Sequence, residues 1–219
     1  MSARSGGRQP AGVLVVTDRH ATCGRPLLTI VTAALQGGAS LVQVREKDLE
    51  GAALLRLVLE VVAEARRVAG DRARVVVNDR LDVALAAKAS GVHLPASGLP
   101  VAGVRRHARA RLLVGRSVHA LAEAREAEKA GADYLVFGPV FATPGKAAYG
   151  EPQGPAALQR VVEAVRIPVW AIGGINLETV GELRGLPLAG VGAITAISTA
   201  PDPAETVRSM RAALGGETT

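Results

Sequence analysis

The chain has 219 residues, and 48% of them are apolar, which is enough to bury a sizeable core. Aromatic residues are limited to two Phe, two Tyr and one Trp, so Val, Leu, Ile and Ala must build that core, as in parallel sheets. The single cysteine, Cys23, excludes an internal disulfide and a multi-cysteine zinc site. No apolar run approaches the roughly 18 residues of a membrane span, and the N-terminal residues lack the apolar segment of a signal peptide. We therefore expect a soluble, cytoplasmic protein.

The formal net charge of +6 favours an anionic partner. Its densest positive run is a predicted helical segment that carries Arg105, Arg106, Arg109 and Arg111. No aromatic side chain alternates with these arginines, so a surface that stacks nucleic-acid bases is not expected. A solvated helix face is the plainer interpretation, and RNA binding is the weaker alternative. We expect a small phosphorylated molecule as the partner, with neither nucleic acid nor membrane.

Short apolar runs alternate with segments of helical periodicity along the whole chain. The predicted strands cover residues 13–17, 41–45, 74–78, 91–94, 112–115, 134–138, 169–172 and 190–194. Helix-compatible stretches follow them, the clearest being 52–68 and 121–130, and the last one covers 203–214. Eight such units in about 200 residues favour a closed barrel over an open sheet. We predict a single (β/α)8 TIM barrel with eight parallel strands over residues 13–214, a disordered lead over 1–12 and a flexible tail over 215–219.

Polar residues at the C-terminal ends of the strands are the candidates for chemistry, because active sites of TIM barrels lie on that face. After the second predicted strand, Gln43, Arg45 and Lys47 alternate along the chain and so share one face, toward the barrel mouth. An amide and two cations facing inward predict an anionic ligand, since buried charge needs a partner. The alternative is an internal ion pair of Arg45 with Glu46 or Asp79.

Three consecutive strand ends carry further polar residues. Asn78 and Asp79 end the third predicted strand, and Asp79 is a candidate metal ligand, ion-pair partner or helix cap. His93 lies within the fourth strand and is interpreted as a packed, satisfied residue. His119 lies beyond the fifth strand beside Ser117, where a general acid or base would be placed. We predict proton transfer by His119 rather than nucleophilic attack by Ser117, because no third triad member is evident.

The last three strand ends predict a loop and a phosphate site. Residues 138–146 are punctuated by Gly and Pro and predict a mobile loop, a candidate lid that carries Lys146. Loops after strands seven and eight bind phosphate in many TIM barrels, often through backbone N–H groups that glycine leaves accessible. The predicted phosphate-binding residues are Gly173, Gly174, Ile194 and Thr195. For the two glycines, a tight turn alone is the alternative.

Five strand-end segments occur together in order. They are Gln43-Val44-Arg45-Glu46-Lys47, Asn78-Asp79-Arg80, Gly91-Val92-His93-Leu94, Gly131-Ala132-Asp133-Tyr134 with Gly138-Pro139-Val140-Phe141, and Ala171-Ile172-Gly173-Gly174-Ile175. Over roughly residues 13–203, this set resembles the thiamine phosphate synthase family and its TenI-type thiazole tautomerase relatives. The resemblance implies a TIM barrel that acts on a phosphorylated thiazole in thiamine biosynthesis.

The family contains two activities, and the chain departs from one of them. Synthases join a pyrimidine pyrophosphate to a thiazole phosphate with Mg²⁺, usually with an acidic pair after strand four and a Thr-x-Thr-Lys loop after strand six. Here the corresponding segments are Pro95-Ala96-Ser97-Gly98 and Thr143-Pro144-Gly145-Lys146. A hard cation prefers carboxylate oxygens, and Asp79 alone remains to supply them.

The segments around Ser97 and His119 resemble the tautomerase branch instead, in which a histidine at the position of His119 is implicated in proton transfer. This reading is favoured and implies metal-independent aromatisation of a carboxythiazole phosphate, with no cofactor. The residues expected to bind substrate are Gln43, Arg45, Lys47, Asn78, Ser97, Ser117 and Lys146. The alternative is a synthase with Mg²⁺ on Asp79, and a second alternative is a non-catalytic relative that binds a phosphorylated ligand. A homo-oligomer is compatible with either.

Overall fold

The computed structural model describes residues 12–108, 112–143 and 151–215. Its eight strands are β1 (Gly12–Val16), β2 (Leu41–Val44), β3 (Arg74–Asn78), β4 (Gly91–Leu94), β5 (Leu113–Val118), β6 (Tyr134–Phe137), β7 (Val169–Ile172) and β8 (Gly190–Ala193). Each strand pairs in parallel with the next along the chain, and β8 pairs with β1. The sheet therefore closes on itself, and the predicted eight-stranded TIM barrel is confirmed.

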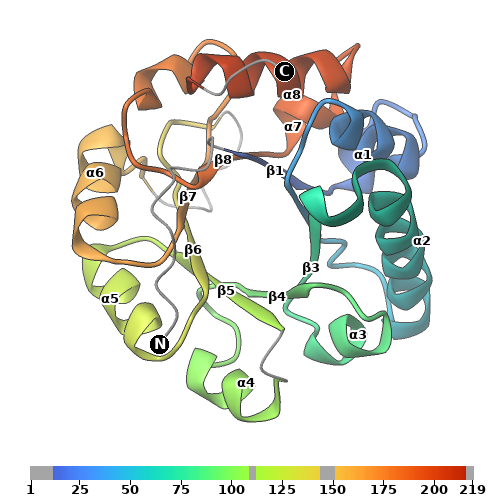
Figure 1. Cartoon of the computed structure of the whole chain (residues 1–219), viewed down its shortest axis with the longest axis horizontal. Coiled ribbons are helices and arrows are strands. Elements are labelled where there is room, and N and C mark those ends of the chain that lie inside the picture. Colours follow the sequence, from blue (N-terminus) through green and yellow to red (C-terminus); the bar gives the residue numbers. More distant parts are fainter. Residues whose placement is uncertain (1–11, 109–111, 144–150, 216–219) are drawn as a thin grey trace.

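Helices surround the barrel as an outer ring (Figure 1). The α-helices are α1 (Leu27–Gln36), α2 (Gly51–Ala69), α3 (Leu81–Ala86), α4 (Val101–His107), α5 (Leu121–Lys129), α6 (Gly154–Ala164), α7 (Thr195–Ser198) and α8 (Pro203–Ala213). The 3-10 helices are η1 (Arg19–Ala21), η2 (Gly70–Arg72) and η4 (Val180–Leu183). Between β7 and β8, where the sequence predicts a helix-compatible stretch, the described residues form η4 alone, because Gly181, Gly185 and Pro187 interrupt that segment. None of the described helices is long and apolar enough to cross a membrane.

The core has two layers, which follow from the alternation of side chains along each strand. One set of strand residues packs outward against the helices. The other set fills the barrel, and its buried members are Leu14, Val16, Leu41, Val76, Tyr134 and Val136. Polar residues two positions farther along the strands continue the inward set, as Gln43 follows Leu41 and Asn78 follows Val76. The interior thus changes from apolar to polar toward the C-terminal ends of the strands.

Several predicted boundaries differ from the structure by one residue or more, and the strands β1 and β5 are two such cases. Gly12, which the sequence places in the N-terminal lead, is the first residue of β1 and donates its N–H to the Ala189 carbonyl at 2.8 Å. Strand β5 continues three residues beyond the predicted segment 112–115 and so contains Ser117. The strand extends because Ser117 and Val118 continue in register with Val136 and Phe137 of β6.

Arg105 corrects the interpretation of the basic run as a purely solvated helix face. Its guanidinium donates to the Gly131 carbonyl at 2.7 Å and the Leu112 carbonyl at 2.9 Å, and it pairs with Asp133. These bonds attach α4 to the segments that precede β5 and β6. Arg109 and Arg111, at the end of the same basic run, lie outside the described residues.

Candidate active site

A cavity of about 990 Å³ opens at the C-terminal ends of the strands. Every strand of the barrel contributes to its lining, and these residues are Val16, Gln43, Asn78, His93, Ser117, Val136, Ile172, Gly192 and Ala193. The predicted site residues that line it are Gln43, Arg45, Lys47, Asn78, Ser97, Ser117, His119, Gly173, Gly174, Ile194 and Thr195. Lys146 lies outside the described residues, and Asp79 is not among the lining residues.

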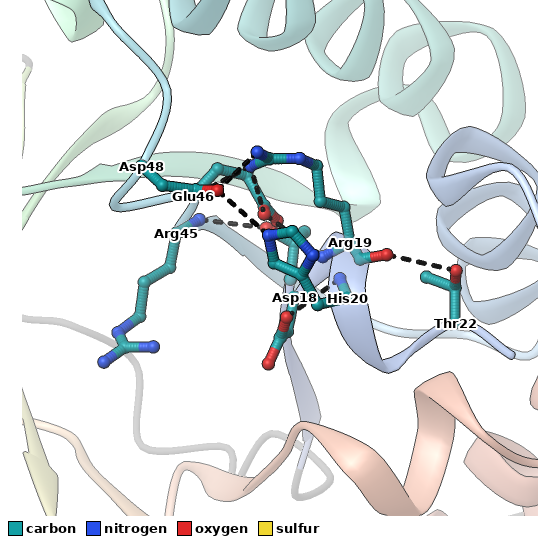
Figure 2. Close-up of polar contacts among 8 residues, drawn as sticks. Asp18, Arg19, His20, Thr22, Arg45, Glu46 and Asp48 are labelled. Atoms are coloured by element: carbon teal, nitrogen blue, oxygen red, sulfur yellow. Dashed lines mark hydrogen bonds and ion pairs between the residues drawn. The ribbon is translucent and has the colours of Figure 1, made fainter. Parts of the chain in front are cut away.

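The basic face of the cavity comes from the chain that leaves β2. Gln43 is buried, and Arg45 is held by its backbone N–H, which donates to the Thr17 hydroxyl at 2.9 Å. The Arg45 side chain extends away from Glu46, which instead turns toward Arg19 (Figure 2). The alternative of an Arg45–Glu46 pair is therefore wrong, because the two side chains leave opposite faces of the extended chain. Arg45 and Lys47 reach the cavity on the inward face.

A group of ionisable side chains, called here the rim brace, ties the loop after β1 to the loop after β2 (Figure 2). It consists of Arg19, His20, Glu46 and Asp48. The Arg19 guanidinium donates to Asp48 at 2.6 Å and to Glu46 at 3.4 Å, and the His20 ring lies 2.9 Å from Asp48. Hydrogen bonds from Arg19 and then from His20 hold the pKa of Asp48 below its usual range. The brace thus fixes the segment that carries the basic face.

Glu46 is the buried member of the rim brace, with a side chain only 2% exposed. Its Oε2 accepts hydrogen bonds from the Arg19 backbone at 3.1 Å and from the Arg19 guanidinium. Its Oε1 has no hydrogen-bond partner within the described part of the chain. Sequence reasoning missed Arg19 and considered Glu46 only as a partner of Arg45. It selected polar side chains at strand ends that face the cavity, whereas these two support the loop from outside the cavity.

The floor of the cavity is a chain of three hydrogen-bonded side chains, called here the floor chain. The His93 ring lies between the Ser117 hydroxyl, at 2.8 Å from Nε2, and the Tyr134 hydroxyl, at 3.2 Å from Nδ1. Burial, and then the charges of Arg116 and Arg45, lower the pKa of His93 to about 3. Burial also raises the pKa of Tyr134 above its usual range. All three groups are therefore uncharged near neutral pH.

His93 is packed and satisfied, as the sequence predicts, but it also lines the cavity. The signal that could have found it is the register: His93 pairs with Asn78 of β3 and with Gly115 of β5, and it belongs to the inward set. Tyr134 offers no such signal, because it lies at the start of β6, where polar residues are not expected to reach the site.

His119 follows β5 and lies at the cavity mouth. Its backbone N–H donates to the Glu123 carboxylate at 2.7 Å, and its Nδ1 bonds to the Gly138 carbonyl. A carbonyl oxygen only accepts, so Nδ1 carries the proton and Nε2 of the neutral ring is left as an acceptor. This arrangement is suited to accepting a proton.

The residues near β3 offer Mg²⁺ a minimal donor set. Asp79 is exposed and has a left-handed φ of 63°. The helix after it has Arg80 at its N-cap, so the helix-cap alternative for Asp79 is wrong, because the left-handed turn moves the cap one residue on. The metal-ligand alternative stays a prediction. Within the described residues, no three His, Cys, Asp or Glu side chains are grouped to hold a metal. One carboxylate fits a Mg²⁺ ion held mainly by substrate phosphates, though not a cage made of protein alone.

The two glycines after β7 line the cavity, and the packing around them also requires glycine at these positions. Gly173 and Gly174 have φ values of 98° and 64°, in the left-handed region that favours glycine. A Cβ on Gly174 would lie 2.5 Å from the Ala142 carbonyl oxygen and 2.7 Å from the Phe141 backbone. The tight turn and the close approach of residues 141–142 therefore require glycine by themselves, and phosphate binding here stays a prediction.

A closed parallel barrel with a polar, partly basic cavity at the C-terminal ends of its strands defines an enzyme of the TIM-barrel class. Residues 13–198 match the thiamine monophosphate synthase family. The chain therefore belongs to this family of thiamine biosynthesis enzymes.

Relatives and a solved structure agree over nearly the whole chain. The chain is 46% identical to a putative thiamine-phosphate synthase of Geobacter sulfurreducens, over 91% of this chain and 92% of the relative. It is 39% identical to a thiamine-phosphate synthase of Methanospirillum hungatei, over 90% of this chain and 94% of the relative. The thiamine phosphate pyrophosphorylase structure from Pyrococcus furiosus superposes with a TM-score of 0.82 at 35% identity, covering 95% of this chain and 97% of that one.

Proposed function

We propose that the protein is a thiamine-phosphate synthase, which joins hydroxymethylpyrimidine pyrophosphate to thiazole phosphate. The observation that carries this proposal is the 46% and 39% identity to synthases over at least nine-tenths of both chains. These relatives support the synthase alternative of the sequence reasoning better than its tautomerase preference. That preference rested on the missing acidic pair after β4, on the altered loop after β6 and on the segments around Ser97 and His119. One carboxylate together with substrate phosphates can replace the acidic pair.

The cavity residues suit a reaction that releases pyrophosphate. In this transfer the thiazole nitrogen bonds to the pyrimidine methylene carbon, while the bond from that carbon to pyrophosphate breaks and its electrons leave with the pyrophosphate. Arg45 and Lys47 line the cavity, and their positive charges would neutralise this leaving group. Gln43 and Asn78 offer uncharged donors and acceptors to the heterocycles. When bound, Mg²⁺ would add positive charge to the pyrophosphate, and Asp79 and Asn78 would hold it.

The size of the cavity also supports a reaction of two substrates. Its volume of about 990 Å³ is at the upper end of the range of roughly 300–1,000 Å³ for small-molecule sites. A single thiazole phosphate would leave much of this space unfilled.

The second candidate is the TenI-type thiazole tautomerase, which His119 favours. Its Nε2 is an acceptor at the cavity mouth, and the ring is held by the Gly138 carbonyl. Such a group can take a proton from a carboxythiazole phosphate and return it at another atom, which aromatises the ring. Arg45 and Lys47 would then bind the substrate's carboxylate or phosphate.

One assay of the purified protein separates these functions. It measures thiamine phosphate from both synthase substrates, with and without Mg²⁺, and aromatisation of the carboxythiazole phosphate in parallel. We expect Mg²⁺-dependent thiamine phosphate formation that Arg45→Ala slows about 100-fold. The matched control Arg106→Ala, on the exposed side of α4, leaves the rate unchanged.

Metal-independent aromatisation that is lost in His119→Ala would overturn the synthase proposal in favour of the tautomerase. Binding of a thiazole phosphate without turnover in either assay would identify a non-catalytic relative.

A further inference from the structure

We propose that Tyr134 and His93 are positioning residues that fix the Ser117 hydroxyl as a hydrogen-bond donor toward the cavity, at a point that takes an anionic oxygen. The proposal rests on the proposed function only for the class of ligand, a phosphate or pyrophosphate. The direction of the hydrogen bonds follows from the floor chain itself.

The first donor of the floor chain is the hydroxyl of Tyr134, a residue that is only 5% exposed. Within the described residues, its hydroxyl has one hydrogen-bond partner, Nδ1 of His93 at 3.2 Å. A buried O–H that donates to nothing is costly, so the phenol proton points to Nδ1. Burial favours the protonated phenol, which keeps that proton in place. Nδ1 of His93 is therefore an acceptor and carries no hydrogen.

The tautomer of His93 determines the direction of its hydrogen bond with Ser117. His93 is 2% exposed, and its two ring nitrogens face hydroxyl groups rather than a carboxylate, so a second proton would leave a buried charge without a counter-ion. A neutral imidazole has one N–H, so with Nδ1 bare the hydrogen is on Nε2. Nε2–H then donates to the Ser117 oxygen at 2.8 Å.

Ser117 completes the chain at the cavity wall. Its oxygen accepts from His93, and within the described part of the chain no protein acceptor is found for its own proton. Ser117 lines the cavity, so its O–H is directed there. A group held as a donor favours an oxygen acceptor and disfavours an N–H of the ligand. Arg45 and Lys47 on the same cavity make an anionic oxygen the favoured acceptor.

A glycine makes the contact between the two strands of the floor chain geometrically feasible. Gly115 pairs in register with His93 of β4 on one side and with Tyr134 of β6 on the other. A Cβ at Gly115 would overlap the Tyr134 ring and hydroxyl. Because this middle position has no side chain, Tyr134 crosses β5 and reaches His93.

The first arm of the test measures the tautomer of His93 in the full chain by nitrogen-15 NMR of labelled histidine, with no ligand and no activity required. We expect a neutral ring with the proton on Nε2. In Tyr134→Phe, which keeps the ring and removes the donor, we expect the proton to appear on Nδ1 in part of the molecules. A proton on Nδ1 in the wild type, or a ring with both nitrogens protonated at neutral pH, would overturn the proposal.

The second arm measures binding of inorganic pyrophosphate and of inorganic phosphate by calorimetry. Ser117→Ala should weaken the tighter of the two about tenfold, as expected for a lost hydrogen bond to a charged group. Tyr134→Phe should weaken it severalfold while folding normally by circular dichroism. Ser90→Ala is the matched control, since Ser90 precedes β4 at the opposite end of the barrel, and its hydroxyl accepts from the Val75 N–H. Unchanged binding in Tyr134→Phe, or no binding of either anion to the wild type, would contradict the proposal.

The two arms separate this inference from the proposed function. If the tautomer and the binding losses are as expected but no thiamine phosphate forms, the synthase proposal fails and the floor chain stands. If the synthase assay succeeds but His93 carries its proton on Nδ1, the floor chain fails and the synthase proposal stands.

Discussion

The floor and the rim of the same cavity hold their polar groups in opposite ways. In the floor chain, His93 and Tyr134 are 2% and 5% exposed, both uncharged, and joined by directional hydrogen bonds. In the rim brace, the side chains of Arg19, Asp48 and His20 are 31%, 51% and 69% exposed. An ion pair joins Arg19 to Asp48, and a hydrogen bond joins His20 to Asp48. Burial penalises charge, so the floor can be polar only if it is neutral. Water screens charge, so the rim can hold ions at little energetic cost or gain.

This difference predicts which region controls stability and which controls the placement of ligand groups. A buried chain with one partner for each donor is disrupted by removing any member, because the remaining polar groups stay buried. An exposed brace loses little when one ion is removed, since water replaces it. Glu46 is the exception within the rim, as its carboxylate is buried.

The largest effect should come from the titration of His93. Its pKa is about 3 in the folded protein against an ordinary value of 6.5, so the unfolded chain binds a proton first as the pH falls. The stabilisation is fully present above pH 6.5 and is lost between that pH and 3. From about pH 7 to about pH 4.5 the wild type should lose roughly 2–3 kcal/mol of unfolding free energy through this group alone.

Urea unfolding of His93→Gln across this pH range provides the comparison, because Gln keeps an N–H for Ser117 and does not titrate. All other groups titrate in both proteins, so their contributions cancel in the difference. Equal pH slopes for the two proteins would contradict the prediction, because they would show that His93 binds its proton equally well in the folded and unfolded states.

The second effect is steric and concerns Gly115. Gly115→Ala should lower the free energy of unfolding by about 2 kcal/mol, because its methyl group overlaps Tyr134 in a closely packed interior. Gly103→Ala is the matched control: Gly103 lies within α4, and the nearest atom to an added Cβ is 4.0 Å away. The control should be neutral or stabilising, since Ala is the better helix former. Similar urea midpoints for the two variants would mean that Tyr134 can move aside freely.

The sequence predicts the barrel well and the floor poorly, for a physical reason. Strands of a parallel barrel are buried on both faces, so each is a short apolar run that is visible by itself. The polar residues at strand ends, such as Gln43 and Asn78, are also visible, because a closed barrel brings all these ends to one face. The contact between His93 and Tyr134 depends on the register of three strands with Gly115 in the middle, which no local pattern encodes.

The rim brace was missed for a related reason. Arg19 lies in the loop after β1 and Glu46 in the loop after β2, and their contact depends on how two loops meet above neighbouring strands. The sequence places Glu46 between Arg45 and Lys47, where any of several pairings satisfies the charges. Three-dimensional structure selects Arg19, because the alternating chain turns Glu46 away from the cavity.

A smaller effect is expected for Glu46→Gln, which keeps the shape of the side chain and removes its charge. The Arg19 backbone and guanidinium can still donate to the amide oxygen, but as bonds to a neutral group. The free energy of unfolding should fall by about 1 kcal/mol. Glu60→Gln, at an exposed position of α2, is the control and should be silent. If Glu46→Gln were as stable as this control, the charge of Glu46 would not stabilise the fold, and the prediction would be wrong.

The smallest effect is expected for Asp48→Asn, at the exposed end of the same brace. Its carboxylate has a pKa lowered by the hydrogen bonds from Arg19 and His20, so its stabilisation is present above the ordinary value of 3.8 and is lost as the pH falls below it. Water screens this group, so at neutral pH the urea midpoint should shift less than in Glu46→Gln. The shift should disappear in about 1 M salt, where the screening length is roughly 3 Å. A shift larger than that of Glu46→Gln, or one that persists in high salt, would contradict the comparison of floor and rim. In that case, the exposure of a polar group would not determine how strongly it stabilises the fold.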